Sequence, residues 1–468
     1  MPMVLVRVLT QHDYGSYQQM ILISTAAAGV LTLGLPTSIY YFYSHVGEKK
    51  IPALIAQTSI MLLVSGILAS LIVILGADYF SKSLNNPSMA GLLQVYALSM
   101  VFMIGSEHCL HFMIAQNRYV LAVTFEILET VVRVLTLLAP MWLGFGFTGL
   151  IAGVVIYAVL RFVVRNTYLF GRSGLDFSGW RQQIFPRQQL DYSLPIALVS
   201  LSSLIGSVFN RAILATTFTP AQYAIYAVGA LEIPLDVIFQ ASVANVLRAS
   251  LPALVRDGNL VEVTRILREA VRKLSIIVLP SFIFLLTHSS QFILLLFTSN
   301  YEESVHIFRI YLWHMPLHML VLSLIPHVFG KPKLNLYISL ATTLLLLILS
   351  YVLLKTIGFY GPAIAVIVSV YVQTILYFII ARRLTKASFF QLVPVRHIAL
   401  VCGVAIISAF VSNQVDHFTR SGLLNLVFAG LAFSATFLII ATFSGILSAE
   451  DRRLIKRWAA KLNLFKRK

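Results

Sequence analysis

The sequence predicts an all-α membrane protein with many transmembrane helices. Of its 468 residues, 58% are hydrophobic and only 11% are charged, and the mean hydropathy is +0.85, far above the values of water-soluble domains. Apolar stretches of about eighteen or more residues follow one another along the chain, and each can cross a hydrocarbon core of about 30 Å. The short alternating strands of a membrane β-barrel are not visible in the sequence. These observations place the chain in a lipid bilayer.

Hydropathy predicts thirteen complete spans. They cover residues 17–44, 51–77, 89–114, 119–143, 147–170, 194–218, 223–247, 274–298, 304–328, 335–356, 360–381, 394–412 and 422–447. Residues 1–9 are apolar but too short to cross. We expect them to be the outer end of a first span that is truncated or whose start is misassigned. We count it as span one, so the thirteen complete spans are spans two to fourteen.

The distribution of basic residues predicts the orientation. Most of the 35 Lys and Arg residues, including five arginines between residues 161 and 187, fall in connections and a tail on one side of the predicted membrane. Cytoplasmic loops carry such an excess, so we expect a multi-pass protein with a cytoplasmic C-terminus. The net charge of +17 then indicates attraction to anionic membrane lipids and not to nucleic acid.

Three basic segments have the apolar face of a helix lying in the cytoplasmic interface. They are residues 177–185, residues 260–274 and the tail, residues 449–468. Apolar residues recur at helical spacing in each of them, and arginines and lysines flank the apolar face. We expect all three to contact anionic lipid.

Two short motifs occur twice. Thr10–Tyr17 reads TQHDYGSY and Thr219–Tyr226 reads TPAQYAIY, while Gly146–Gly149 reads GFTG and Gly358–Gly361 reads GFYG. The spacing predicts a parallel repeat of six spans, which is common in transporters. The predicted domains are an N-terminal lobe (1–190), a C-terminal lobe (191–390), a pair of extra spans (391–448) and the basic tail (449–468).

Charged residues inside predicted spans are the first site candidates, because each ionised group at bilayer depth costs about 3 kcal/mol on insertion scales. Glu126, Glu129 and Arg133 share one helix face, and Glu129 and Arg133 have the spacing of an ion pair. An internal ion pair and a contact with substrate both remain open. Arg7 lies beside the first copy of the repeated turn.

Arg211 has no acid within helical reach on its own span. Glu232 and Asp236, which flank Pro234 in the next span, are its predicted partners and candidate groups for ion coupling; a structural pair and a substrate role remain open. Glu107, deep in the fourth span, is a further candidate for a coupling proton, with polar packing as the alternative. We expect no metal site, no cofactor and no catalytic residue, because metal-ligand sets and catalytic motifs are not visible.

Several segments resemble the bacterial polysaccharide-transporter flippases of the multidrug, oligosaccharidyl-lipid and polysaccharide exporter (MOP) superfamily. They are Arg7–Tyr17 (RVLTQHDYGSY), Tyr192–Pro195 (YSLP), Asn210–Leu214 (NRAIL) and Leu251–Leu254 (LPAL). The resemblance covers nearly the whole chain. It departs from the family pattern at Asn210, where many members carry an acid, and this weakens an ion-coupling role there.

The resemblance implies two six-helix lobes around a cationic cavity. The function it implies is that of a flippase, which moves an undecaprenyl-diphosphate-linked oligosaccharide across the bacterial cytoplasmic (inner) membrane by alternating access. The product would be O-antigen, capsule or exopolysaccharide, and polysaccharide polymerase machinery is a candidate partner. Arg7, Arg133 and Arg211 suit a diphosphate, and with Glu126 and Glu129 they are the candidate substrate-binding residues.

Two other classes remain as alternatives. A cation-coupled multidrug exporter of the same superfamily should centre on acids, whereas spans five and seven carry arginines. A membrane glycosyltransferase or polymerase would need a large outer loop with catalytic acids. The longest predicted outer connections, residues 78–88 and 413–421, are too short for that, so we expect a transporter and not an enzyme.

Overall fold

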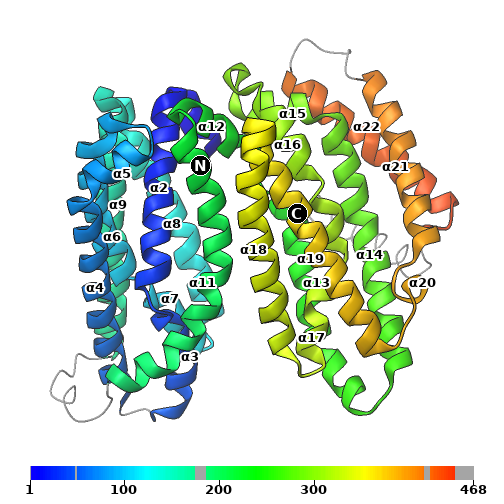
Figure 1. The fold of residues 1–468 in the computed structure, drawn as a ribbon, viewed down its shortest axis with the longest axis horizontal. Coiled ribbons are helices and arrows are strands. Elements are labelled where there is room, and N and C mark those ends of the chain that lie inside the picture. Colours follow the sequence, from blue (N-terminus) through cyan, green and yellow to red (C-terminus); the bar gives the residue numbers. More distant parts are fainter. Residues whose placement is uncertain (1, 48–49, 174–185, 416–421, 448–468) are drawn as a thin grey trace, which may run out of the picture. The chain divides into compact units, whose positions relative to one another are not determined.

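The protein is helical throughout the part that the structure describes. The structure is a computed structural model and describes residues 2–47, 50–173, 186–415 and 422–447, and all regular structure in these ranges is helix (Figure 1). By packing, the chain divides into two compact units, Met1–Ala227 and Val228–Lys468. The predicted all-α class is confirmed.

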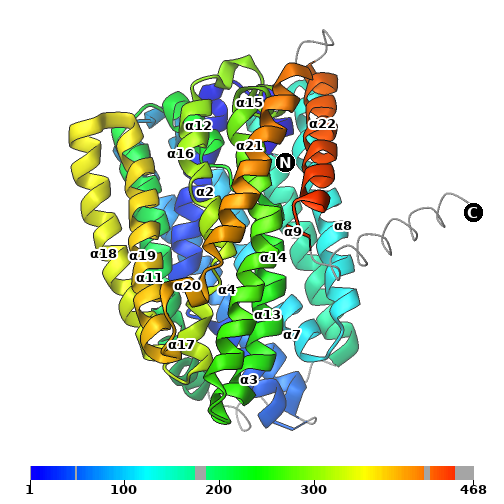
Figure 2. The same cartoon turned by 90° about the vertical axis from the view of Figure 1, so that its right-hand side faces the viewer.

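The first unit is built from long helices interrupted by short breaks. Its elements are α1 (Pro2–Val8), α2 (Gln11–Leu31), α3 (Leu35–His45), α4 (Ile51–Leu75), α5 (Ala77–Ser83), η2 (Pro87–Met89), α6 (Ala90–Gly105), α7 (His108–Ala115), α8 (Tyr119–Pro140), η3 (Met141–Phe145), α9 (Gly146–Ser173), α11 (Pro186–Thr217) and α12 (Pro220–Gly229). Helices α4, α6, α9 and α8 pack side by side in that order. Helix α2 runs alongside α4 and α6, and α3 packs against α4 and α7 (Figures 1 and 2).

The second unit contains the remaining helices. Its elements are α13 (Pro234–Arg256), α14 (Leu260–Thr287), α15 (Ser289–Phe297), η4 (Ser299–Tyr301), α16 (Ser304–Leu312), η5 (Met315–Met319), η6 (Leu322–Leu324), α17 (Ile325–Val328), α18 (Pro332–Ile357), η7 (Gly358–Tyr360), α19 (Gly361–Thr385), α20 (Phe389–Leu392), α21 (Val395–Val415) and α22 (Gly422–Phe443). Helices α18 and α19 lie side by side along their length, as do α21 and α22 (Figure 2).

The number of membrane crossings depends on how the long helical stretches are divided into single spans. In the described part of the chain, nine helical stretches are long and apolar enough to cross a membrane, or ten when a pair bent by 54° is counted as one span. Two of them, Tyr119–Gly171 and Pro332–Thr385, each contain two packed helices. The chain is a multi-pass membrane protein, and the count of thirteen stays a prediction.

Helix α11 packs in the first unit, although the sequence repeat begins its second copy at residue 191. The buried amide of Gln189 donates from Nε2 to Ser38 Oγ at 2.9 Å, and its Oε1 accepts from Gln57 Nε2 at 2.8 Å. These contacts join α11 to α3 and α4. The division by packing therefore falls at residue 227, while the six-span lobes remain a prediction from the repeat.

The prediction that residues 260–274 form a helix lying in the membrane interface is wrong. These residues begin α14, which continues without a break to Thr287. The predicted lipid face, which includes Val263, Leu267, Val271 and Leu274, is buried against other helices of the second unit. The periodicity was informative, but a helical apolar stripe does not say whether lipid or protein covers it. Residues 177–185 and the tail lie outside the described residues.

Both copies of the first repeated motif make the same helix start. The Thr10 hydroxyl accepts from the backbone N–H of Asp13 at 3.1 Å, and the Thr219 hydroxyl accepts from that of Gln222 at 3.3 Å. A threonine that caps the third N–H satisfies a donor that the helix leaves unpaired. Tyr14 and Tyr223, four residues after each threonine, are both buried.

Both copies of the second motif also adopt one conformation. Gly146 has φ 56° and ψ −141°, and Gly358 has φ 76° and ψ −133°, a region that residues with a Cβ rarely adopt. The fourth residue of each motif is crowded, because a Cβ on Gly149 or Gly361 would lie 2.6 or 2.2 Å from its nearest neighbour. The two motifs therefore form equivalent turns, α8 to α9 and α18 to α19.

We expect Gly146→Ala and Gly358→Ala each to destabilise the protein by about 1–3 kcal/mol, because alanine is strained at these angles. The thermal unfolding of the purified full chain in detergent measures this. The control is Gly91→Ala in α6, where a Cβ would meet open space. Equal unfolding temperatures for all three variants would show that the glycine conformations carry no constraint.

Candidate functional site

The second predicted span is broken in its middle. Helix α2 ends at Leu31 and α3 begins at Leu35, and Leu33 and Gly34 both have positive φ values, 51° and 67°. A Cβ on Gly34 would lie 2.8 Å from the carbonyl oxygen of Ser193 on α11. Glycine at this position therefore lets a third helix approach the break.

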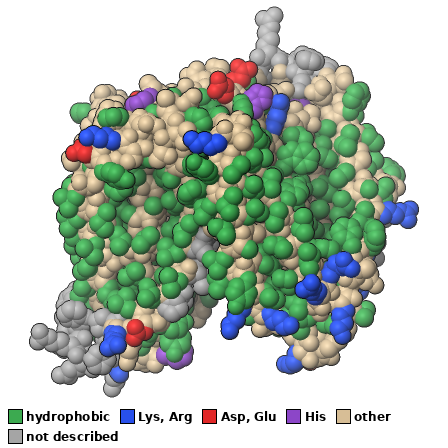
Figure 3. Space-filling view, viewed as in Figure 1, with side chains coloured by type: hydrophobic (Ala, Val, Ile, Leu, Met, Phe, Trp, Pro, Cys, Tyr) green, Lys and Arg blue, Asp and Glu red, His purple; other side chains and the backbone are tan. Residues whose placement is uncertain are grey.

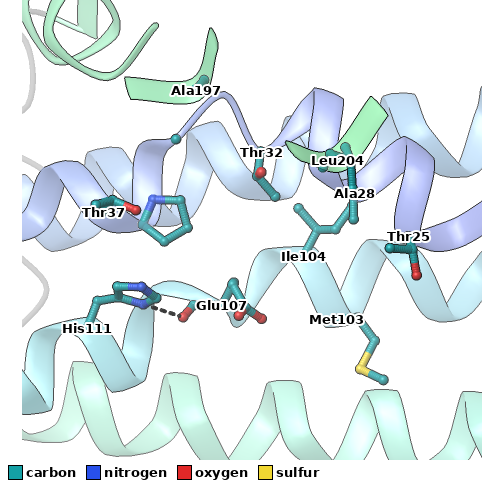
Figure 4. Close-up of a pocket in the computed structure, with 13 residues that line it drawn as sticks. Thr25, Ala28, Thr32, Thr37, Met103, Ile104, Glu107, His111, Ala197 and Leu204 are labelled. Atoms are coloured by element: carbon teal, nitrogen blue, oxygen red, sulfur yellow. Dashed lines mark hydrogen bonds between the residues drawn. The ribbon is translucent and has the colours of Figure 1, made fainter. Parts of the chain in front are cut away.

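The fourth predicted span is broken as well. Helix α6 ends at Gly105 and α7 begins at His108, so Glu107 stands directly before α7. Non-helical backbone at membrane depth is tolerated where it lines a cavity. The two breaks line one cavity of about 520 Å³ in the first unit (Figure 4). Its lining residues are Thr25, Ala28, Gly29, Thr32, Gly34, Pro36, Thr37, Met103, Ile104, Glu107, His111, Ala197 and Leu204.

The lining of the cavity combines polar and apolar side chains. Thr32 lies in the α2–α3 break and Thr37 on α3, and they are faced by Glu107 in the α6–α7 break and by His111 on α7 (Figure 4). The Nδ1 atom of His111 lies 3.2 Å from the carbonyl oxygen of Glu107. Such a lining can hydrogen-bond a ligand's hydroxyl groups while apolar walls cover its carbon faces.

A charged cluster stands next to the cavity. Arg161 of α9 donates from Nη2 to Glu107 Oε2 at 2.7 Å. Arg165, one turn further along α9, is 1% exposed and donates from Nε and Nη2 to the two carboxylate oxygens of Glu129 at 2.7 and 2.6 Å. Its Nη2 also lies 3.3 Å from Glu126 Oε1. The cluster thus joins α8, α9 and the α6–α7 break through a bidentate buried ion pair.

The structure places these charges differently from the sequence analysis in one respect. Arg161 and Arg165 do not lie in an inner connection, because α9 extends to Ser173 and carries both inside the helix. Of the two possibilities left open for Glu129 and Arg133, the internal ion pair is not formed, since Glu129 pairs with Arg165 and lies 3.8 Å from Arg161. The i, i+4 spacing of the two arginines, opposite two acids at i, i+3, was the signal that could have identified the cluster.

The three arginines predicted to bind substrate all lie in the first unit. Arg7 is on α1, Arg133 on α8 and Arg211 on α11, and all three side chains are exposed. Among the described residues, Arg133 and Arg211 form no ion pair.

The candidate coupling residues are spread over both units. Glu107 lines the large cavity and is held by Arg161. Glu232 lies at the break between α12 and α13 and lines a cavity of about 20 Å³ with His314 and His318, room for about one water molecule. The side chain of Asp236 lies outside the described part, and the Arg211–Glu232 pair remains a prediction.

The fold is similar to that of several solved membrane transporters. The lipid II flippase MurJ in an inward closed conformation superposes with a TM-score of 0.68 at 15% identity, covering 94% of this chain and 97% of that one. An inward-facing multidrug MATE transporter gives 0.66 at 14% identity, with 83% and 92% covered. A MOP superfamily transporter from Pyrococcus furiosus gives 0.58 at 15% identity, with 83% and 92% covered.

The sequence itself defines the family. Residues 4–306 match the family described as polysaccharide biosynthesis protein, and the chain belongs to this family. No curated protein matches the sequence. The predicted resemblance to the polysaccharide transporters of the MOP superfamily is confirmed, and the fold is one that these solved membrane transporters share.

We expect Glu129→Gln to lower the free energy of unfolding by about 3–5 kcal/mol, because it leaves the buried guanidinium of Arg165 without its bidentate partner. The matched variant Arg133→Gln, on the same helix face, should change it by less than about 0.5 kcal/mol, because Arg133 is exposed and makes no ion pair with a described residue. Thermal or denaturant unfolding of the purified full chain measures both. A loss with Arg133→Gln as large as that with Glu129→Gln would make Arg133 a structural residue.

Proposed function

We propose that the protein is a flippase that moves an undecaprenyl-diphosphate-linked oligosaccharide across the bacterial cytoplasmic membrane by alternating access. The observation that carries the proposal is the pairing of charges in the first unit. Arg161 and Arg165 hold the carboxylates of Glu107, Glu126 and Glu129. Arg133 and Arg211 are therefore left without an acid in the described part of the chain.

The exposed arginines suit an anionic ligand. An arginine in a membrane span that has no carboxylate partner needs water or a ligand anion, because the charge is costly at bilayer depth. The planar guanidinium binds phosphate oxygens in a bidentate manner, and a diphosphate can engage two such groups. Arg133 and Arg211 are therefore the proposed diphosphate-binding residues, and Arg7 is proposed with them because its side chain is exposed in the same unit. Glu126 and Glu129 would act on the substrate through Arg165, by positioning α8.

The cavity at the two helix breaks suits the saccharide. Sugars present hydroxyl groups at their edges and carbon–hydrogen faces between them, and the cavity offers both threonine hydroxyls and apolar walls. Glu107 is the one carboxylate in its lining and can accept hydrogen bonds from sugar hydroxyls. Its volume of about 520 Å³ lies within the usual range of small-molecule sites.

The orientation and the product follow from the family and the charge distribution. Lys and Arg side chains gather at the end of the second unit where α17 lies and where α19 ends (Figure 3). Under the positive-inside rule this end is cytoplasmic, and a cytoplasmic C-terminus follows. Membership in the polysaccharide biosynthesis family supports a role in making O-antigen, capsule or exopolysaccharide, with the polymerase machinery as a partner.

Arg133→Gln and Arg211→Gln should each slow translocation by about tenfold to a hundredfold, because each removes a charged hydrogen bond worth about 1.5–3 kcal/mol. The assay uses the reconstituted full chain and a fluorescent undecaprenyl-diphosphate oligosaccharide, whose outer-leaflet fraction is measured with a membrane-impermeant quencher. Arg133→Lys should retain part of the rate.

The control for charge is Lys82→Gln, an exposed cation on α5 of the same unit. Complementation of flippase-deficient strains of known glycan type, with wild type and with both arginine variants, identifies the glycan. Full rates in Arg133→Gln and Arg211→Gln would remove these arginines from the mechanism.

A cation-coupled multidrug exporter is the second candidate function. The similarity of the fold to MATE transporters favours it, as does the Glu232 carboxylate at a broken helix. The same vesicles decide between the two, since an exporter would move a cationic dye and leave the lipid-linked oligosaccharide in place. A membrane glycosyltransferase or polymerase is not favoured, because the fold is that of transporters.

If Glu232 carries the coupling ion, Glu232→Gln should abolish the acceleration of transport by an imposed proton or sodium gradient while leaving the rate without a gradient. Glutamine keeps the size and hydrogen bonds of glutamate but cannot take up a proton or balance a cation. Glu302→Gln, an exposed acid in the same unit, is the control. A gradient response that persists in Glu232→Gln places the coupling group elsewhere.

A further inference from the structure

A basic pocket lies at the end of α19 in the second unit. It has a volume of about 600 Å³ and is lined by Ile379, Arg382, Arg383, Lys386, Ala387, Ser388 and Gln391. We propose that this pocket binds the phosphate of an anionic membrane phospholipid. The site is separate from the cavity of the first unit, and the inference does not depend on which substrate is transported.

The backbone brings these residues into one pocket. Helix α19 ends at Thr385, and Lys386 takes a left-handed conformation with φ 56°, which turns the chain back. The N–H of Ser388 then donates to Gln391 Oε1 at 2.7 Å and starts α20. Lys386 and Gln391 therefore line the same space as the arginines of the last turn of α19.

Hydrogen bonds fix the backbone of the turn that forms the pocket. Arg268 of α14 donates to the carbonyl oxygens of Phe390 and Gln391, the latter at 3.4 Å. The buried Thr385 hydroxyl donates to the Ala381 carbonyl at 2.8 Å and accepts from the Ala387 N–H at 3.3 Å. A ligand would thus meet a turn whose backbone is already ordered, which lowers the entropic cost of binding.

No acid of the described residues balances the charges of the pocket. Its lining contains three cations and no acid, and Arg382, Arg383 and Lys386 form no ion pair with a described residue. Elsewhere in the same unit the opposite holds, because Arg265 pairs with Glu262 at 2.5 Å and Arg272 with Glu269 at 2.7 Å. Three unpaired cations around one concave space suit an anion with several oxygen atoms.

The surroundings favour a lipid over free phosphate. Ile379 in the pocket wall is 41% exposed, and Phe389 and Phe390, beside the pocket, are 42% and 69% exposed. The helices on either side, α19 and α21, are both candidate membrane spans, so the pocket lies where a span ends. A phospholipid matches this arrangement, because its phosphate meets the cations and its acyl chains meet the apolar side chains.

The test compares the wild-type full chain with Arg382→Gln/Arg383→Gln and with Lys331→Gln/Lys333→Gln. The second pair removes the same charge from exposed residues outside the pocket. Each protein is purified in detergent and titrated with phosphatidylglycerol, with phosphatidylethanolamine or with free glycerol phosphate, and its thermal unfolding and retained lipid are followed by calorimetry and native mass spectrometry.

Wild type and the Lys331→Gln/Lys333→Gln control should be stabilised by phosphatidylglycerol, and Arg382→Gln/Arg383→Gln should bind it roughly tenfold to thirtyfold more weakly. Arg382→Lys/Arg383→Lys keeps the charge and should retain stabilisation, which separates loss of binding from misfolding. Equal stabilisation of wild type and Arg382→Gln/Arg383→Gln would overturn the site. Equal protection of wild type by glycerol phosphate, or by phosphatidylethanolamine, would overturn the assignment to an anionic lipid.

Discussion

The buried guanidinium of Arg165 is the constraint on which the first unit depends. A charge that is 1% exposed must be neutralised within the protein, and Glu129 does this with two short hydrogen bonds across the α8–α9 interface. The pair fixes the rotation of both helices. It also directs Arg161, one turn away, toward Glu107 at the α6–α7 break. The shape of the cavity thus follows from an ion pair that does not line it.

The same constraint separates two kinds of arginine. Arg161 and Arg165 each form ion pairs with carboxylates, so their positive charge is largely balanced within the unit. Arg133 and Arg211 lie in helices of the same unit, but they are exposed and form no ion pair with a described residue. The number of arginines in the first unit therefore overstates its positive potential. The proposed anion-binding role belongs to Arg133 and Arg211, which form no ion pair with a described residue.

Interrupted helices occur in both units of the described chain. In the first unit α2–α3 and α6–α7 are broken, and in the second the segment from α16 to α17 is bent. The break between α12 and α13 follows directly after residue 227, where the division by packing falls, and Thr10 and Thr219 start α2 and α12 in the same way. The cavities at the breaks differ greatly in volume, about 520 and 20 Å³, and His314 and His318 line the smaller one.

The sequence by itself determined the class, the family and the local conformation of the repeated turns. Hydropathy reports burial in lipid residue by residue, and a capping threonine or a glycine with positive φ acts within a few residues of its own position. The tertiary structure decided which charges meet. The sequence allows Glu129 to pair with Arg133 on its own helix or with Arg165 on the next, and packing selects Arg165. It also decided where the apolar face of residues 260–274 is buried, and where the breaks at Gly34 and Glu107 come together. Partners on different helices are set by rotation and packing, which no local pattern records.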